Sequence, residues 1–165
     1  MTRILDDIIL ASLLVVLGFG SCECSSPLRA QSRPSARALA DVARCLVAED
    51  ERGSDWGAIL DVLERRGAQH GMSAAAMARA YCAVHRARFP SARQARIRAL
   101  PDAAPSPRLA GVYERALEAA AAGGPGTCAA EHWGAATGDD YARAIGAGWT
   151  RVECGTTRNA FWRLP

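Results

Sequence analysis

Lysine is absent from this sequence, and all 20 of its basic residues are arginine. Alanine and glycine are abundant, so we attribute the arginines to a GC-rich coding bias rather than to a polyanionic partner. The net charge of +3 is too small to argue otherwise. We therefore expect no nucleic-acid partner. A nucleic-acid binder, the alternative, would use Arg86, Arg88, Arg93, Arg96 and Arg98.

Several motifs that carry a known chemistry are also missing. The chain has no Gly-rich phosphate-binding loop and no nucleophile motif of a Ser-His-Asp or Cys-His enzyme. The cysteines beyond residue 26 include no Cys-x-x-Cys pair, which disfavours a four-thiolate zinc site. We expect no metal and no cofactor. His70 and His85 receive no role.

The sequence has no apolar run long enough to span a bilayer comfortably, since a spanning helix needs about 20 apolar residues. Arg3 precedes a shorter apolar run, Ile8 to Gly20, which is typical of a secretory signal. Gly20-Ser21-Cys22 resembles a lipoprotein processing site. Residues 1–26 thus predict a cleaved signal, a lipid attachment site or an uncleaved membrane anchor; a buried helix of the domain is a further alternative.

We accordingly expect an exported protein that is periplasmic, extracellular or membrane-anchored through this segment, in a bacterium or its phage. Export gives the cysteines a role, because four remain in the body and an even number is compatible with two disulfides. Cys128 and Cys154 bracket the last, Gly-rich section, so we pair them. Cys45 and Cys82 lie within helical patterns, and their disulfide would join two helices.

The body predicts one monomeric domain over residues 37–165, after a linker at residues 27–36. Apolar residues recur at helical spacing in five stretches: Ala36–Glu49, Ser54–Gly67 with Ser54 as cap, Ser73–Ala87, Ala92–Leu100, and a long helix from about Leu109 to Gly123. The tail, residues 125–165, is rich in glycine and threonine and predicts short strands at Trp149–Cys154 and Asn159–Leu164. The expected fold is α+β and mainly helical, with a small irregular β flap at the C-terminus.

Glu49 is the candidate for chemistry. It follows Val42 by seven positions, which places it about 20° from Val42 around the helix axis and so on the apolar stripe. Lost hydration at the rim of that stripe raises the pKa of a carboxyl. An acid protonated near neutral pH is what a glycosidase needs to protonate a leaving oxygen. The alternative is a solvated glutamate at a helix end.

Six segments resemble the cell wall hydrolases of the spore-cortex-lytic type, in the correct order over roughly residues 39 to 165. In the first half of the chain these are Ala43-Arg44-Cys45-Leu46-Val47-Ala48-Glu49, Arg52-Gly53, and Gly57 with Ala58–Arg66. In the second half they are Phe89-Pro90, Ala130-Glu131-His132-Trp133, and Gly155 to Trp162.

The resemblance implies a lysozyme-like α+β domain that cleaves peptidoglycan glycan strands, with Glu49 as the catalytic acid. His132, Trp133, Asn159 and Trp162 would face the sugar; core packing is the alternative for the two indoles and our preferred reading of Trp149. Two departures bear on catalysis: Gly53 or Ser54 stands where the family has a second Glu, and Asn159 replaces a His.

A lone acid favours a lytic transglycosylase over a muramidase. A two-carboxylate hydrolase would need a partner for Glu49 about 5 to 9.5 Å away, and the candidates are Asp50, Glu51, Asp55 and Glu131. The alternative function is a non-catalytic exported lipoprotein or wall-binding module with a degenerate site.

Overall fold

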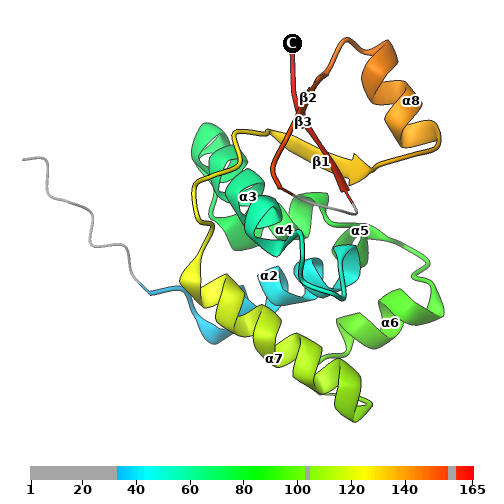
Figure 1. The fold of residues 1–165 in the computed structure, drawn as a ribbon. Helices are drawn as coiled ribbons and strands as arrows, with labels where there is room; N and C mark the ends of the chain where they lie inside the picture. Colours follow the sequence, from blue (N-terminus) through cyan, green and yellow to red (C-terminus); the bar gives the residue numbers. More distant parts are fainter. Residues whose placement is uncertain (1–32, 103–104, 156–158) are drawn as a thin grey trace, which may run out of the picture. The chain divides into compact units, whose positions relative to one another are not determined.

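The computed structural model describes residues 33–102, 105–155 and 159–165 (Figure 1). The predicted signal or anchor at residues 1–26 and most of the linker lie outside these residues. The helices are α2 (Ala36–Glu49), α3 (Trp56–His70), α4 (Ala74–Tyr81), α5 (Ala83–Arg86), α6 (Ala92–Arg98), α7 (Pro107–Ala122) and α8 (Asp139–Gly146). The strands are β1 (His132–Ala135), β2 (Thr150–Val152) and β3 (Asn159–Arg163).

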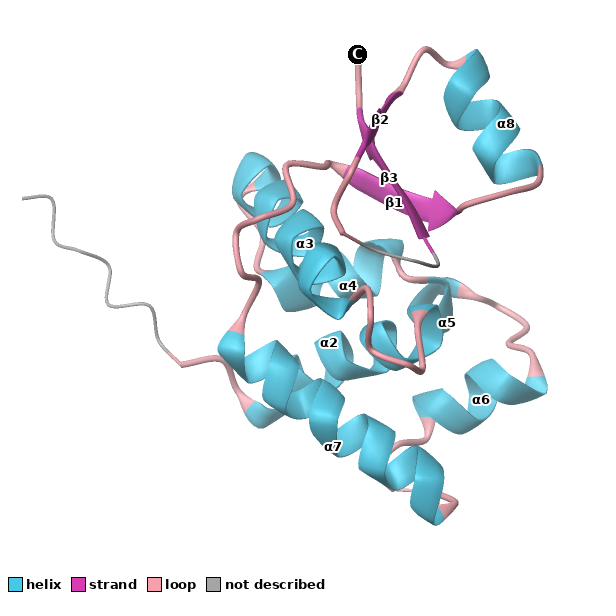
Figure 2. Ribbon diagram, viewed as in Figure 1, coloured by secondary structure: helices cyan, strands magenta, loops and turns pink. Residues whose placement is uncertain are grey.

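The predicted α+β fold, mainly helical with a small sheet near the C-terminus, is confirmed (Figure 2). Helices α2 to α7 precede the three strands, and α8 lies between β1 and β2 in the chain. Over the described ranges, no helix has the length and apolar character needed to cross a membrane.

Helix α2 is the centre of the helical body and contacts α4, α5, α6 and α7. The Ser35 hydroxyl accepts a hydrogen bond from Ala38 N at 3.2 Å and so caps its first turn. The helix ends at Glu49 because Asp50 is extended. Its last carbonyls bind side chains from elsewhere: Arg93 donates to Val47 O and Ala48 O, and the Trp56 indole donates to Leu46 O. The predicted bounds of this helix are confirmed.

Helix α3 differs from the prediction at both ends. Ser54 does not cap it, since its hydroxyl donates to Asp50 and Asp55 in the preceding loop. Gly67 does not end it either: the helix continues to His70, and Gly71 closes it with a φ of 64°. A Cβ on Gly67 would lie 2.6 Å from the Met72 carbonyl oxygen, so close packing explains that glycine.

The predicted third helix is broken in two. Cys82 has extended backbone angles and separates α4 from α5, and its side chain forms a disulfide with Cys45 of α2. The second predicted disulfide, Cys128–Cys154, is also present and joins the segment before β1 to the segment after β2. Both pairings are confirmed, and they are compatible with an oxidising compartment.

The sheet is antiparallel in the order β1-β3-β2, and helices cover both of its faces (Figures 1 and 2). Trp133 and Phe161 are register partners and belong to the core of the helical body. Ala160 and Trp162 point to the other face and pack with Ala144 of α8. Two predicted strands are confirmed with narrower bounds, whereas β1 and α8 were not predicted.

Candidate functional site

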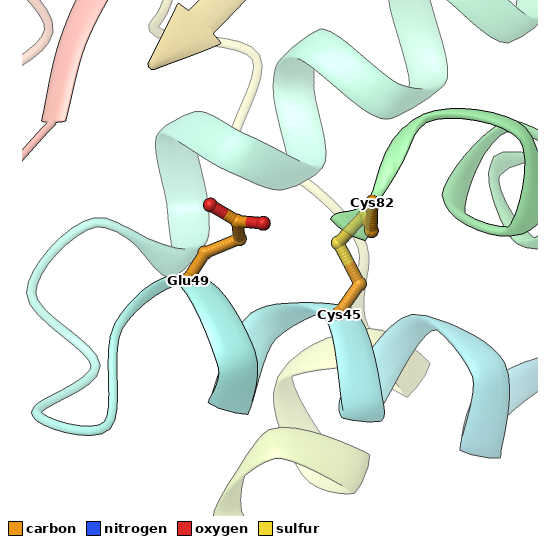
Figure 3. A group of neighbouring side chains, drawn as sticks. All are labelled: Cys45, Glu49 and Cys82. Carbon is orange, nitrogen blue, oxygen red and sulfur yellow. A yellow bond between two sulfur atoms is a disulfide. The ribbon is translucent and has the colours of Figure 1, made fainter. Parts of the chain in front are cut away.

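Glu49 ends α2 and lies between the helical body and the sheet. Figure 3 shows its side chain on the same side of α2 as Cys45, one turn earlier. A carboxylate oxygen and the sulfurs of Cys45 and Cys82 all lie within 4.8 Å of one another. The two cysteines are buried and Glu49 is half-buried. An apolar disulfide therefore lies next to the carboxyl group and takes the place of water that would otherwise hydrate it.

Burial raises the pKa of the Glu49 carboxyl above its ordinary value of 4.5, even though two neighbours lower it. The Trp133 indole donates a hydrogen bond to the carboxylate, and the Arg93 guanidinium stabilises its charge. Desolvation outweighs both. The helical periodicity predicted this direction, and the structure adds the two groups that oppose it.

Cys45, Glu49 and Cys82 together have the donor types of a metal site. Both sulfurs are committed to the disulfide, however, so neither is the thiolate that a zinc ligand must be (Figure 3). With the two cysteines oxidised, these three residues form a carboxyl group beside a disulfide and do not provide a ligand set for a metal.

Asp50 is fully buried beneath the loop that follows Glu49. Its carboxylate accepts hydrogen bonds from Arg52 N at 3.0 Å, the Ser54 hydroxyl at 2.9 Å and Asp55 N at 3.1 Å. Burial by itself would raise the pKa of this carboxyl, but these hydrogen bonds outweigh it and the pKa is lowered. Asp50 thus holds the loop together and is poorly placed to act as the second acid of a hydrolase.

Asp55 is also fully buried, and it connects the same loop to β3. Its Oδ2 accepts from the backbone N of Asn159 at 2.8 Å and from the Asn159 side chain at 2.9 Å. We predicted Asn159 to face substrate; its amide instead binds a buried carboxylate of the protein. Asn159 and Asp55 are therefore parts of the framework beside Glu49.

The two remaining candidates for a second carboxylate lie in ion pairs or hydrogen bonds of their own. Glu51 pairs with Arg93 at 3.1 Å. Glu131 accepts from Gln69 at 3.0 Å and from Leu164 N at 3.1 Å, and these hydrogen bonds lower its pKa. The structure brings neither one to Glu49 by any contact we observe.

The predicted sugar-binding residues are divided between the two faces of the sheet. Trp133 is 9% exposed and points to Glu49, whereas His132 and Trp162 are register partners on the side of α8. Trp162 is 1% exposed and packs against Tyr141 at 5.3 Å between ring centroids. Trp149, which we expected in the core, is half-buried, with its ring 4.9 Å from that of His132. The core reading thus fits Trp133 and Trp162, which are buried, and fits Trp149 in part, because Trp149 packs against the cluster of Trp162 while remaining half-buried.

A pocket of about 430 Å³ opens on the α8 side of the sheet. It is lined by His132, Trp133, Gly134, Ala135, Arg143, Ala144, Ala147, Trp149 and Trp162. Trp133 borders this pocket as part of β1, whereas its indole faces Glu49 on the other side of the sheet. Glu49 itself does not line the pocket.

Sequence reasoning missed two arginines that position this region. Arg93 was considered only as one of the arginines of the nucleic-acid alternative, yet it binds the last carbonyls of α2 and Glu51. Arg66 donates to Glu131 O and contacts His132 Nδ1 at 3.4 Å, and its guanidinium lies 4.2 Å from the centre of the Tyr81 ring. The helical pattern carried no sign of either role, since the hydrogen bonds from Arg93 to Ala48 O and from Arg66 to Glu131 O span 45 and 65 residues.

Arg98 shows the same use of arginine, because it donates to the carbonyls of Val84 and Ala87. Two of the five arginines of the nucleic-acid alternative, Arg93 and Arg98, therefore bind the protein's own backbone.

Comparison of the chain with protein-family models, with curated proteins and with solved structures finds no match.

Proposed function

We propose that this domain cleaves the glycan strands of peptidoglycan, with Glu49 as the general acid and then the general base. One observation carries the proposal: Glu49 is a half-buried carboxyl group with a raised pKa, at the junction of the helical body and the sheet. A functional carboxylic acid needs such an environment, because it must hold its proton near neutral pH.

In the proposed mechanism, protonated Glu49 donates its proton to the glycosidic oxygen as the bond to the anomeric carbon breaks. The Trp133 indole, which donates to the carboxylate, stabilises the anion that Glu49 becomes. Arg93 adds a positive charge for the same anion. The hydrogen bond from Trp133 also orients the carboxyl group before the reaction.

A transglycosylase mechanism suits the surrounding acids best. Asp50 and Asp55 are buried and accept hydrogen bonds from the protein, and Glu51 and Glu131 are engaged elsewhere. Because none of these four carboxylates is placed to activate water, a hydroxyl group of the sugar closes on the anomeric carbon. Glu49 takes the proton of that hydroxyl and is ready for another cycle.

The proposed substrate lies outside the cytoplasm, so we also propose export through the N-terminal segment. The proposed enzyme is a monomer. The two disulfides support this location because they persist in oxidising compartments.

Mass spectrometry of muropeptides tests the activity. Purified peptidoglycan incubated with the wild-type domain should acquire anhydro ends, whereas a muramidase would leave reducing ends. Glu49→Gln should abolish both, because the Gln amide has no acidic proton to donate. Glu51→Gln is the matched control: this acid lies two residues away in an ion pair with Arg93 and should retain activity. Unchanged strands with folded wild-type protein would rule the enzyme out.

The second candidate is a wall-binding module without catalysis. It is favoured by the pocket beside α8, which is rich in aromatic side chains and which Glu49 does not line. Co-sedimentation with insoluble peptidoglycan separates the two functions: binding without any new chain ends, in wild type and Glu49→Gln alike, supports the module.

A further inference from the structure

The pocket between α8 and the sheet has a wall of two chemical kinds. Indole rings come from Trp149 and Trp162, whereas the Trp133 indole faces Glu49 on the other side of the sheet. Polar groups come from the imidazole of His132 and the guanidinium of Arg143. A volume of about 430 Å³ lies within the range of small-molecule sites, which is about 300 to 1,000 Å³.

The buried part of this wall is rigid. Trp162 is almost fully buried and packs in a cluster with Ala144 and Ala160, with Tyr141 and Trp149 at its edge. Trp149 is held at both ends: its backbone N donates to Ala144 O at 3.0 Å, and its ring meets the His132 imidazole edge-to-face. A preformed aromatic wall costs a ligand little conformational entropy to use.

We propose that this pocket binds a pyranose ring of a glycan chain, as a second site distinct from the point of cleavage. A pyranose has an apolar C–H face and a rim of hydroxyl groups, so it matches a wall that offers both indoles and hydrogen-bonding groups. Trp149, half-buried and reached from solvent, is the stacking surface. Arg143 and His132 bind the polar rim.

The site differs from Glu49: Trp133 belongs to the β1 strand that borders the pocket, but its indole faces Glu49 on the other side of the sheet. The choice of an N-acetylated glycan as ligand rests on the proposed function, whereas the site itself does not require Glu49 to react.

The test is a titration of the Glu49→Gln domain with tetra-N-acetylchitotetraose, followed by amide and indole N–H shifts in NMR. No turnover occurs in this variant, so binding is measured separately from cleavage. We expect saturable shifts at Gly134, Ala147 and the Trp149 indole. Trp149→Ala should weaken the affinity about tenfold.

Two further variants protect the result against misfolding. Ala147 is exposed at the pocket rim, so Ala147→Trp should fill the pocket without disturbing the core, and it should abolish the shifts. Phe89→Ala removes an aromatic ring that is 84% exposed and far from the pocket in sequence, and it should change nothing.

Absence of saturable shifts at about 10 mM sugar overturns the proposal, as does equal affinity in Ala147→Trp. A concentration-dependent dimer that Ala147→Trp abolishes would also overturn it, because a second copy would then cover the pocket. Saturable binding with no cleavage by wild type sinks the proposed enzyme and leaves this site standing.

Discussion

Asp55 and Asn159 are 104 residues apart in the sequence, yet two hydrogen bonds join them: the backbone N and the side-chain amide of Asn159 both donate to Asp55 Oδ2, at 2.8 and 2.9 Å. The carboxylate also accepts from the Ser54 hydroxyl at 3.1 Å. Asp55 precedes α3 and Asn159 begins β3, so these hydrogen bonds connect the sheet to the loop that follows Glu49.

We expect Asp55→Ala to lower the free energy of unfolding by about 2–3 kcal/mol, since buried N–H groups lose a charged acceptor. Urea denaturation followed by circular dichroism measures the change. Glu118→Ala, which removes an exposed carboxylate from α7, is the control and should stay within about 0.5 kcal/mol of wild type. An equally small effect of Asp55→Ala would mean that the contact is dispensable.

Gly124 allows the chain after α7 to pass close to α3. A Cβ at this position would lie 2.8 Å from Asp61 N, and the Asp61 carboxylate binds Gly126 N and Cys128 N at 2.6 and 2.7 Å. Gly124→Ala should therefore destabilise the domain by about 1–3 kcal/mol. Gly111→Ala, on α7 with open space around it, should be neutral or stabilising by up to about 1 kcal/mol. Thermal melts of the two variants should shift in opposite directions or differ clearly in size.

Glu49 makes stability depend on pH with a definite sign. The pKa of Glu49 is higher in the folded than in the unfolded chain. Below pH 4.5 the carboxyl group is protonated in both states, so it does not lower the free energy of unfolding there. Stability then falls as the pH rises from 4.5 through the raised folded pKa. Glu49→Gln should therefore be more stable than wild type near neutral pH, with the gain vanishing at about pH 3. Urea unfolding at a series of pH values checks this; a gain that is equal at every pH contradicts it.

Arg93 lowers the pKa of Glu49 through its charge. Arg93→Gln should therefore raise that pKa further and move the alkaline limb of any Glu49-dependent activity to higher pH. Carbon-13 NMR titration of the carboxyl group reports the pKa directly. Arg96→Gln, which removes an exposed charge from the same helix, is the matched control and should leave the titration unchanged.

Each disulfide should contribute several kilocalories to stability. Their sequence separations are 37 and 26 residues, and the loop entropy of the unfolded chain then gives about 4 and about 3.5 kcal/mol. We expect the Cys45→Ala/Cys82→Ala and Cys128→Ala/Cys154→Ala pairs to lose comparable amounts in urea denaturation under oxidising conditions. When both of its disulfides are reduced, the wild type should have a free energy of unfolding no higher than that of the less stable double variant.

The helical body was predictable because its signals are local. Ser35 and the periodic residues from Leu39 to Val47 fix α2, and the same periodicity gives the half-burial of Glu49. The two disulfide pairs were predicted from the positions of the cysteines: Cys128 and Cys154 bracket the Gly-rich tail, and Cys45 and Cys82 lie in two separate helical patterns. The local pattern wrongly predicted that Gly67 ends α3, whereas this glycine lies inside the helix where it packs closely against Met72.

The sheet needed the tertiary structure. Strand β3 is buried on both faces, so Ala160, Phe161 and Trp162 show no alternation, and β1 is four residues long with two of them glycine and alanine. Which tryptophan is buried depends on α8, whose residues Tyr141 and Ala144 cover Trp162 and leave Trp149 at the pocket.

The sequence by itself determined most of the helical body and the placing of Glu49 at the edge of an apolar stripe, because neighbouring residues specify both; the positions of the cysteines along the chain indicated their pairing. Only the tertiary structure decided what surrounds that acid: Trp133 from β1, Arg93 from α6 and the disulfide to Cys82. These groups reach Glu49 from 33 to 84 positions further along the chain. No local pattern encodes such contacts, because they exist only once the helices and the sheet have packed.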